Sequence, residues 1–275
     1  DHPLLLVVGT YGPHHTFVAP PELYAKYLEL VAPPVEAESV DMHPFDRQRI
    51  KQDDRLTPDA VHRIRAAYCG LIEHIDGVFG QVMEAWDARI DRIDRPGVAC
   101  YLSDHGEQAG HRGLWGKMSF YEDSAGIPMI FRGGGVASGA SVSTPVSLLD
   151  VTPTLCELAG APALPEPDGV SLAESLADGG EPTRRAVLAE TYFGKQNIVG
   201  RMARKDRWKY IAYRSPARAD LAGQDVMFDL AKDPGETRNL APLDEYTETL
   251  TEHRRILEEH LEATDEPFWS LEVAV

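Results

Sequence analysis

A short apolar run that stops at a carboxylate and an imidazole constrains the fold of this chain most. Residues 98–102 read Val-Ala-Cys-Tyr-Leu, and Asp104 and His105 follow directly after Ser103. Continuous apolar runs of this length are typical of buried strands in parallel sheets, and open α/β sheets bind ligands at the carboxyl ends of such strands. The pattern therefore predicts an α/β fold with Asp104 and His105 at a ligand-binding edge.

The loop after this strand carries groups suited to a metal ion and to an anion. Asp104 and His105 combine an oxygen and a nitrogen donor, which suits a divalent metal. The glycine-punctuated loop then ends in Lys117, a compact cation able to hold an anionic group. These residues together indicate metal-assisted attack on a sulfate or phosphate ester. The structural alternative for the Asp104-His105 pair is a capped loop that merely follows a strand.

Charge and length restrict the partners and the class of protein. The chain has 275 residues, enough for one large domain or two, and a formal charge of −17. This charge argues against nucleic acid or an anionic membrane surface as a partner, but a small anionic substrate is compatible with a locally positive site. The sequence leaves a homo-oligomer open.

The sequence carries neither an apolar run long enough to span a bilayer nor a start that resembles a signal peptide. We therefore expect a mature or truncated soluble chain, which could be cytoplasmic, periplasmic or secreted. Cys69, Cys100 and Cys156 fit no zinc spacing or disulfide framework, so we expect buried free thiols.

The first residues predict a second strand and a second functional loop. Residues 4–8, Leu-Leu-Leu-Val-Val, have the pattern of a fully buried strand. Because a central strand needs neighbours on both sides, we expect the first part of this domain to be missing from the sequence. His14 and His15 follow in the Gly/Pro-rich loop 9–21, and we expect them to reach the same site as Asp104.

A helix over 58–90 is the strongest local prediction. Thr57 is a suitable N-cap and Pro58 suits the first helical position. One apolar stripe recurs at steps of three and four residues, which is typical of a helix facing a core. Its members are Val61, Ile64, Tyr68, Leu71, Ile75, Val78, Val82 and Trp86. Gly70, Gly77 and Gly80 are the places where we expect a bend or an interruption.

The remaining segments suggest two units. We expect short helices at 22–30 and 147–159, a surface excursion at 32–57, a strand at 127–131 and a seam at 161–185. Closely spaced strands follow at 186–190, 197–203, 208–213 and 226–229, and an amphipathic helix covers 243–263. We expect residues 1–165 to form the C-terminal portion of an α/β catalytic domain and residues 180–275 a small α+β subdomain.

Several segments, in order, resemble the sulfatases of the alkaline phosphatase superfamily, of the arylsulfatase and choline-sulfatase kind. They are Gly12-Pro-His-His-Thr-Phe17, Ser103-Asp-His-Gly-Glu107, Gly113-Leu-Trp-Gly-Lys-Met-Ser-Phe-Tyr-Glu122, Val146-Ser-Leu-Leu-Asp-Val-Thr-Pro-Thr154, Arg207-Trp-Lys-Tyr-Ile211 and Asp233-Pro-Gly-Glu-Thr-Arg-Asn-Leu240. The resemblance implies a mixed or parallel sheet sandwiched by helices, followed by a small antiparallel-sheet subdomain with a closing helix. It also implies sulfuric ester hydrolase activity on a small sulfated, or alternatively phosphorylated, ester.

The resemblance implies roles for individual residues. Asp104 and His105 match two metal ligands, and Lys117 matches the lysine that contacts the sulfate. His14 matches the histidine near the leaving group, with His15 as the fallback. The implied metal is Ca²⁺, although ligand softness alone favours Mn²⁺ or Zn²⁺ for a site with a histidine. Arg112 is closer to choline-sulfatase-like variants than to the commonest form of the loop.

One departure concerns the nucleophile. The family's Cys/Ser-x-Pro-x-Arg motif, whose first residue becomes formylglycine, does not occur in the sequence. No nucleophile is therefore assigned in this chain, and we expect that segment to precede Asp1. Three hypotheses remain open: a sulfatase, a phosphodiesterase or phosphonate monoester hydrolase of the same superfamily, and a non-catalytic half-domain that binds an anion.

Overall fold

The computed structural model describes residues 4–51, 53–183, 186–218, 220 and 224–264. Its α-helices are α1 (Pro21–Leu30), α2 (Pro44–Arg47), α3 (Pro58–Ile93), α4 (Glu122–Ala125), α5 (Val151–Leu158), α6 (Ala173–Asp178) and α7 (Thr247–Ala263). Its strands are β1 (Val98–Leu102), β2 (Met129–Gly133), β3 (Val187–Phe193), β4 (Ile198–Lys205), β5 (Trp208–Arg214) and β6 (Val226–Asp229). The 3-10 turns include η1 (Ala37–Ser39), η2 (His111–Gly113), η3 (Leu148–Asp150) and η5 (Asp244–Tyr246).

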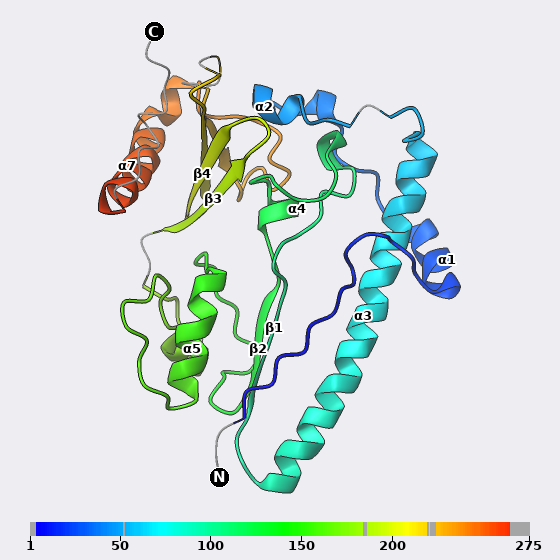
Figure 1. Ribbon diagram of the computed structural model, residues 1–275, viewed down its shortest axis with the longest axis vertical. Helices are drawn as coiled ribbons and strands as arrows, with labels where there is room; N and C mark the ends of the chain where they lie inside the picture. The colour runs from blue at the N-terminus through cyan, green and yellow to red at the C-terminus, as the bar shows by residue number, and fades with distance from the viewer. Residues whose placement is uncertain (1–3, 52, 184–185, 219, 221–223, 265–275) are drawn as a thin grey trace.

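Helix α3 confirms the strongest local prediction and extends it by three residues. The Thr57 hydroxyl accepts a hydrogen bond from the Ala60 amide at 3.2 Å, and the helix continues without interruption for 36 residues (Figure 1). The interruption expected at the glycines is not found. Gly70 instead allows close packing, because a Cβ there would lie 3.0 Å from Ala19 Cβ. No described helix is long and apolar enough to cross a membrane.

Strand β1 forms where the sequence predicts it, but its pairing differs. It pairs antiparallel with β2, with Tyr101 opposite Ile130, and most of its residues are only half-buried. Pro128 precedes β2, as expected for a residue that cannot donate to a sheet. The expected parallel neighbours are not found among the described residues. Helix α3 covers one face of the pair, where Phe79 packs against Tyr101 at a ring distance of 4.8 Å.

The predicted buried strand at residues 4–8 is not found. The segment has no strand assignment, and its side chains are 53–82% exposed. Figure 1 shows it as an extended trace passing along α3. An apolar run becomes a strand only when neighbouring strands supply hydrogen-bond partners. The described residues offer this segment none.

The predicted C-terminal sheet is confirmed. Its order is β3-β4-β5-β6, all antiparallel, and α7 packs against β4 and β5. Two hydrophobic clusters lie on the sheet, and α7 contributes Leu257 to one of them. The pattern of alternating faces follows from the two-residue repeat of a strand, which sends Tyr210 and Ile211 into different clusters.

The segment 32–57 is not the surface excursion that its sequence suggests. Val40, Met42 and Phe45 are at most 7% exposed and join the cluster that contains Tyr213. Their spacing has no helix or strand period, so sequence patterning does not reveal their burial. The segment thereby joins the C-terminal sheet to the loop that follows β1.

The three cysteines are free, as expected, but half-buried rather than buried. Burial raises the pKa of the Cys69 thiol and raises that of Cys100 to about 11. Both are thus poor nucleophiles near neutral pH.

Candidate active site

Three of the predicted site residues lie together just after β1. Lys117 Nζ lies 2.7 Å from His105 Nε2, and Asp104 Oδ2 lies 3.4 Å from the same nitrogen. The Asp104 side chain is 83% exposed, whereas His105 is 27% exposed. The structure therefore brings a carboxylate, an imidazole and an ammonium group into one open cluster.

The hydrogen bonds of His105 assign its tautomer. Its Nδ1 lies 2.8 Å from the Gly106 carbonyl oxygen, which can only accept, so we place the proton on Nδ1. Nε2 then carries a lone pair and accepts from the Lys117 ammonium. A backbone carbonyl that fixes a histidine tautomer in this way is a usual arrangement for metal-binding histidines.

His14 comes to the same place from a different loop. Its ring centroid is 6.3 Å from that of His105. Its Nδ1 lies 3.0 Å from the His15 carbonyl oxygen, which also accepts from the Tyr11 hydroxyl at 2.9 Å. The proton therefore belongs on Nδ1 of the neutral ring, and Nε2 is the nitrogen that can gain a proton. His15 is exposed and packs on His14 at a ring distance of 4.1 Å.

Gly106 fixes the turn that orients His105. Its amide donates to the Ser124 carbonyl at 2.8 Å. A Cβ at Gly106 would lie 2.2 Å from the Asp123 carbonyl oxygen, so only glycine fits. The Ser103 hydroxyl also donates to the His105 carbonyl at 2.9 Å. The sequence signals this role only as a glycine next to two candidate ligands.

Arg49 is a site-supporting residue that the sequence does not reveal. Its Nη2 donates to the Lys117 carbonyl at 3.3 Å, and its Nη1 lies 3.2 Å from Asp46 Oδ1. The guanidinium also lies over the Phe193 ring, 5.1 Å from its centroid. The backbone of Lys117 is therefore tied to the buried cluster of the C-terminal sheet.

Arg112 is a structural anchor rather than a substrate-binding residue. It is 1% exposed, and its Nη1 pairs with Asp123 at 2.5 Å. Its Nη2 donates to the Gly235 carbonyl at 2.5 Å, and the guanidinium stacks over Tyr121 at 4.3 Å. It therefore holds the site loop against the C-terminal sheet.

Asp104 and His105 fit two positions of a metal shell. An exposed carboxylate and an imidazole lone pair 3.4 Å apart can serve the same ion. In the described part of the chain, no group of three or more His, Cys, Asp or Glu side chains could hold a metal. A metal bound at Nε2 would replace its hydrogen bond with Lys117. The residues present thus fit part of a metal site.

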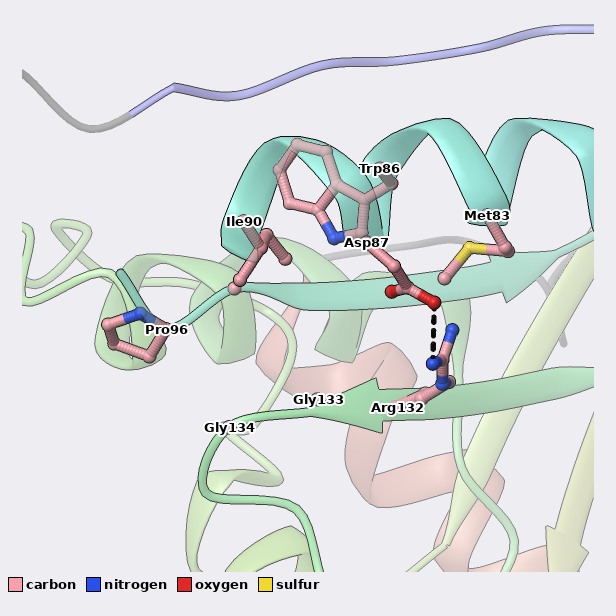
Figure 2. Close-up of a pocket in the computed structure, with 9 residues that line it drawn as sticks. Met83, Trp86, Asp87, Ile90, Pro96, Arg132, Gly133 and Gly134 are labelled. Carbon is pink, nitrogen blue, oxygen red and sulfur yellow. Dashed lines mark hydrogen bonds and ion pairs between the residues drawn. The ribbon is translucent and has the colours of Figure 1, made fainter. Parts of the chain in front are cut away.

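A separate groove lies at the opposite end of β1, between α3 and the start of the strand pair. It is lined by Met83, Trp86, Asp87, Ile90, Pro96, Gly97, Arg132, Gly133 and Gly134 (Figure 2). The ion pair between Asp87 and Arg132, at 2.8 Å, crosses its rim. None of the predicted site residues lines this groove, so it is distinct from the cluster around His105.

Comparison with known families supplies the class of protein. The family described as "Sulfatase" matches residues 1–161, which is more than half of the chain. The chain belongs to the sulfatase family. A second match, described as "N-sulphoglucosamine sulphohydrolase, C-terminal", covers residues 110–263. The resemblance of the ordered motifs is thereby confirmed.

Individual relatives agree with this assignment. Choline-sulfatase of Rhizobium meliloti (strain 1021) is 34% identical over 280 residues, covering 96% of this chain and 52% of the relative. A solved 2-O GAG sulfatase has a TM-score of 0.69 at 25% identity, covering 100% of this chain and 57% of that one. The phosphonate monoester hydrolase of Agrobacterium radiobacter has a TM-score of 0.61 at 27% identity, covering 76% of this chain and 43% of that one.

These matches confirm the α/β fold class and set the scope of functional statements. This sulfatase-family chain spans about half the length of the relatives that it matches. Sulfatases generally use a divalent metal, a property of the family that the Asp104-His105 pair can serve in part.

Proposed function

We propose that this chain contributes part of the active site of a metal-assisted sulfuric ester hydrolase. The observation that carries the proposal is the convergence of Lys117 and His14 on His105 from two separate loops. Membership of the sulfatase family supports it. In this proposal, residues 1–165 belong to the catalytic domain and residues 180–275 form a subdomain that supports it.

Lys117 and His14 have different roles in the proposed reaction. The Lys117 ammonium stabilises the negative charge on the sulfate oxygens as the S–O bond to the alcohol breaks. His14 donates a proton from Nε2 to the departing alkoxide, a role suited to an imidazole near neutral pH. His15 is the fallback donor, although it is exposed and its ring contact is with His14.

Asp104 and His105 are the proposed ligands from this chain to a divalent metal, with Ca²⁺ first. When bound, such an ion supplies charge neutralisation and orientation at the sulfate. The nitrogen of His105 favours Mn²⁺ or Zn²⁺ on ligand softness alone. Activity with each metal added separately distinguishes these ions from Ca²⁺. Because the sequence contains no Cys/Ser-x-Pro-x-Arg motif, the attacking group in this proposal comes from outside these residues.

A second candidate is hydrolysis of a phosphate diester or phosphonate monoester. The similarity to the phosphonate monoester hydrolase of Agrobacterium radiobacter favours it. The same cation and proton donor can serve phosphorus as well as sulfur, since both esters place negative oxygens around the reacting atom.

The test uses a preparation that includes the segment supplying the attacking group. It compares hydrolysis of an aryl sulfate with that of an aryl phosphate diester, with Ca²⁺, Mn²⁺ or Zn²⁺ added separately. We expect faster sulfate hydrolysis and a loss of roughly 10²–10³ in kcat for His14→Ala. His74→Ala, an exposed change on α3, is the control. Faster diester hydrolysis would favour the second candidate. Hydrolysis of neither ester would reject both and leave an anion-binding half-domain.

A further inference from the structure

The loop between His105 and Lys117 is closed by a carboxylate that neither role uses. Glu107 Oε1 accepts hydrogen bonds from the Gly116 amide at 2.6 Å and from the Ala109 amide at 2.9 Å. Hydrogen bonds to an ionised acceptor are shorter and stronger than those between neutral groups. One side-chain oxygen therefore joins the first part of the loop to its last part.

Gln108 makes a second closure beside the first. The backbone amide of Gln108 donates to the Gly116 carbonyl at 2.9 Å, and its side-chain Nε2 lies 2.5 Å from Ser119 Oγ. Gln108 is 1% exposed. Both backbone groups of Gly116 are thus bonded to consecutive residues near the start of the loop.

These bonds shorten the path between the two site residues. Lys117 and His105 are 12 positions apart in sequence. Through the bond from Glu107 to the Gly116 amide this path is shorter, because Glu107 lies two positions after His105 and Lys117 follows Gly116 directly. Gly116 has φ +72°, a conformation that glycine adopts freely, and a Cβ there would meet nothing within 4 Å. Gly116 itself therefore offers no side-chain contact to hold the end of the loop, and the bonds to Glu107 and Gln108 hold it together with the bond from Arg49 to the Lys117 carbonyl.

We infer that Glu107 is a positioning residue, which places Lys117 on the His105 side of the site by holding the Gly116 amide. The inference rests on the proposed function for the consequence in catalysis, but not for the geometry. Glu107 acts through the backbone of the loop and needs no contact with substrate. This role is separate from those proposed for the metal ligands, the lysine and the proton donor, because none of them requires a carboxylate at position 107.

The geometric part is tested by hydrogen exchange at the Gly116 amide. We expect Glu107→Ala to exchange about tenfold faster there, because loss of a charge-assisted bond lowers the opening free energy. Glu107→Gln keeps an acceptor oxygen and should exchange at an intermediate rate. Glu84→Ala, an exposed change on α3, should leave Gly116 unchanged. Exchange at Gly116 that is the same in Glu107→Ala and wild type overturns the inference.

The catalytic part is tested by steady-state hydrolysis of the preferred ester. We expect kcat for Glu107→Ala to fall about 10- to 100-fold, as for other residues that support a site. KM should change much less, because the lost placement matters most in the transition state. Glu107→Gln should recover most of kcat. Local loosening with an unchanged kcat would mean that Glu107 only shapes the loop, and would overturn its positioning role.

Failure of the proposed function gives a different result. If the wild-type protein hydrolyses neither ester, the enzyme proposal fails while exchange at Gly116 still decides the geometric claim. A general folding defect is also distinguishable. It would speed exchange in α3 and in the C-terminal sheet, whereas loss of the Glu107 bonds should affect residues 108–117 alone.

Discussion

The Lys117 ammonium lies 2.7 Å from His105 Nε2 and donates to the lone pair of the imidazole. This contact places an ammonium group, the proposed anion-binding group, beside a nitrogen that is suited to a metal. The two residues lie 12 positions apart, so the loop between them, rather than local sequence, sets their distance. His14 joins them from a loop that precedes them by about ninety residues.

Removal of the Lys117 ammonium should impair turnover more than folding. We expect Lys117→Ala to lower kcat by roughly 10²–10³, a typical loss for one electrostatic group at a reacting centre. Lys117→Arg keeps the charge but changes its shape, and should recover part of the rate. Kinetics of ester hydrolysis provide the measurement, with Lys195→Ala as the exposed control. A kcat for Lys117→Ala within threefold of wild type, in the range expected of an uninvolved side chain, would contradict the role.

Two glycines of α3 should respond oppositely to alanine. Gly77→Ala adds a Cβ that meets nothing within 4 Å, and should raise the free energy of unfolding by about 1 kcal/mol through helix propensity. Gly70→Ala places a Cβ 3.0 Å from Ala19 Cβ and 3.2 Å from the Leu23 backbone, and should lower it. Urea unfolding of both variants measures the difference. Equal shifts in the same direction would show that α1 does not pack at Gly70.

The buried ion pair of Lys209 and Glu236 should be costly to break from one side. Lys209 Nζ lies 2.7 Å from Glu236 Oε1, and both side chains are 0% exposed. Lys209→Met should cost about 3–5 kcal/mol, because it removes the near cation of a buried carboxylate and leaves only Arg112, at 3.6 Å, to pair with it. Combining it with Glu236→Gln should recover part of that loss.

The exposed pair of Lys205 and Glu252 is the matched control for this experiment. Their side chains are 31% and 42% exposed. Lys205→Met should cost less than about 1 kcal/mol, since solvent screens the pair. Chemical denaturation of wild type and of the three variants gives these free energies of unfolding. Similar costs for Lys209→Met and Lys205→Met would contradict the burial argument.

Asp46 should make stability depend on pH. Burial raises its pKa from 3.8 to about 6, although Arg49 and the Tyr213 hydroxyl oppose the shift. The folded protein therefore keeps this proton at pH values where the unfolded chain has released it. Wild type should lose on the order of 2 kcal/mol relative to Asp46→Asn as pH rises from about 4 to about 6, and the loss should level off above about pH 7. Chemical unfolding of both proteins across this range gives the free energy of unfolding of wild type minus that of Asp46→Asn. A value that stays constant or increases with pH would contradict the prediction.

Local patterns in the sequence predicted most of the secondary structure. The Thr57-Pro58 start and the apolar stripe predicted α3, because capping and a 3.6-residue period depend only on neighbouring residues. The closely spaced runs between 186 and 229 predicted the C-terminal sheet for the same kind of reason. The burial of Phe45 could not be predicted, since its apolar neighbours have no regular spacing.

The sequence by itself determined the residue types of the candidate site and the family, because Asp104, His105 and Lys117 stand in ordered motifs next to a recognisable strand. Only the tertiary structure decided how these residues meet. The arrival of His14 beside His105 and the support of Lys117 by Arg49 depend on contacts between distant segments. Such contacts arise from packing and hydrogen bonding across the fold, and no local period encodes them.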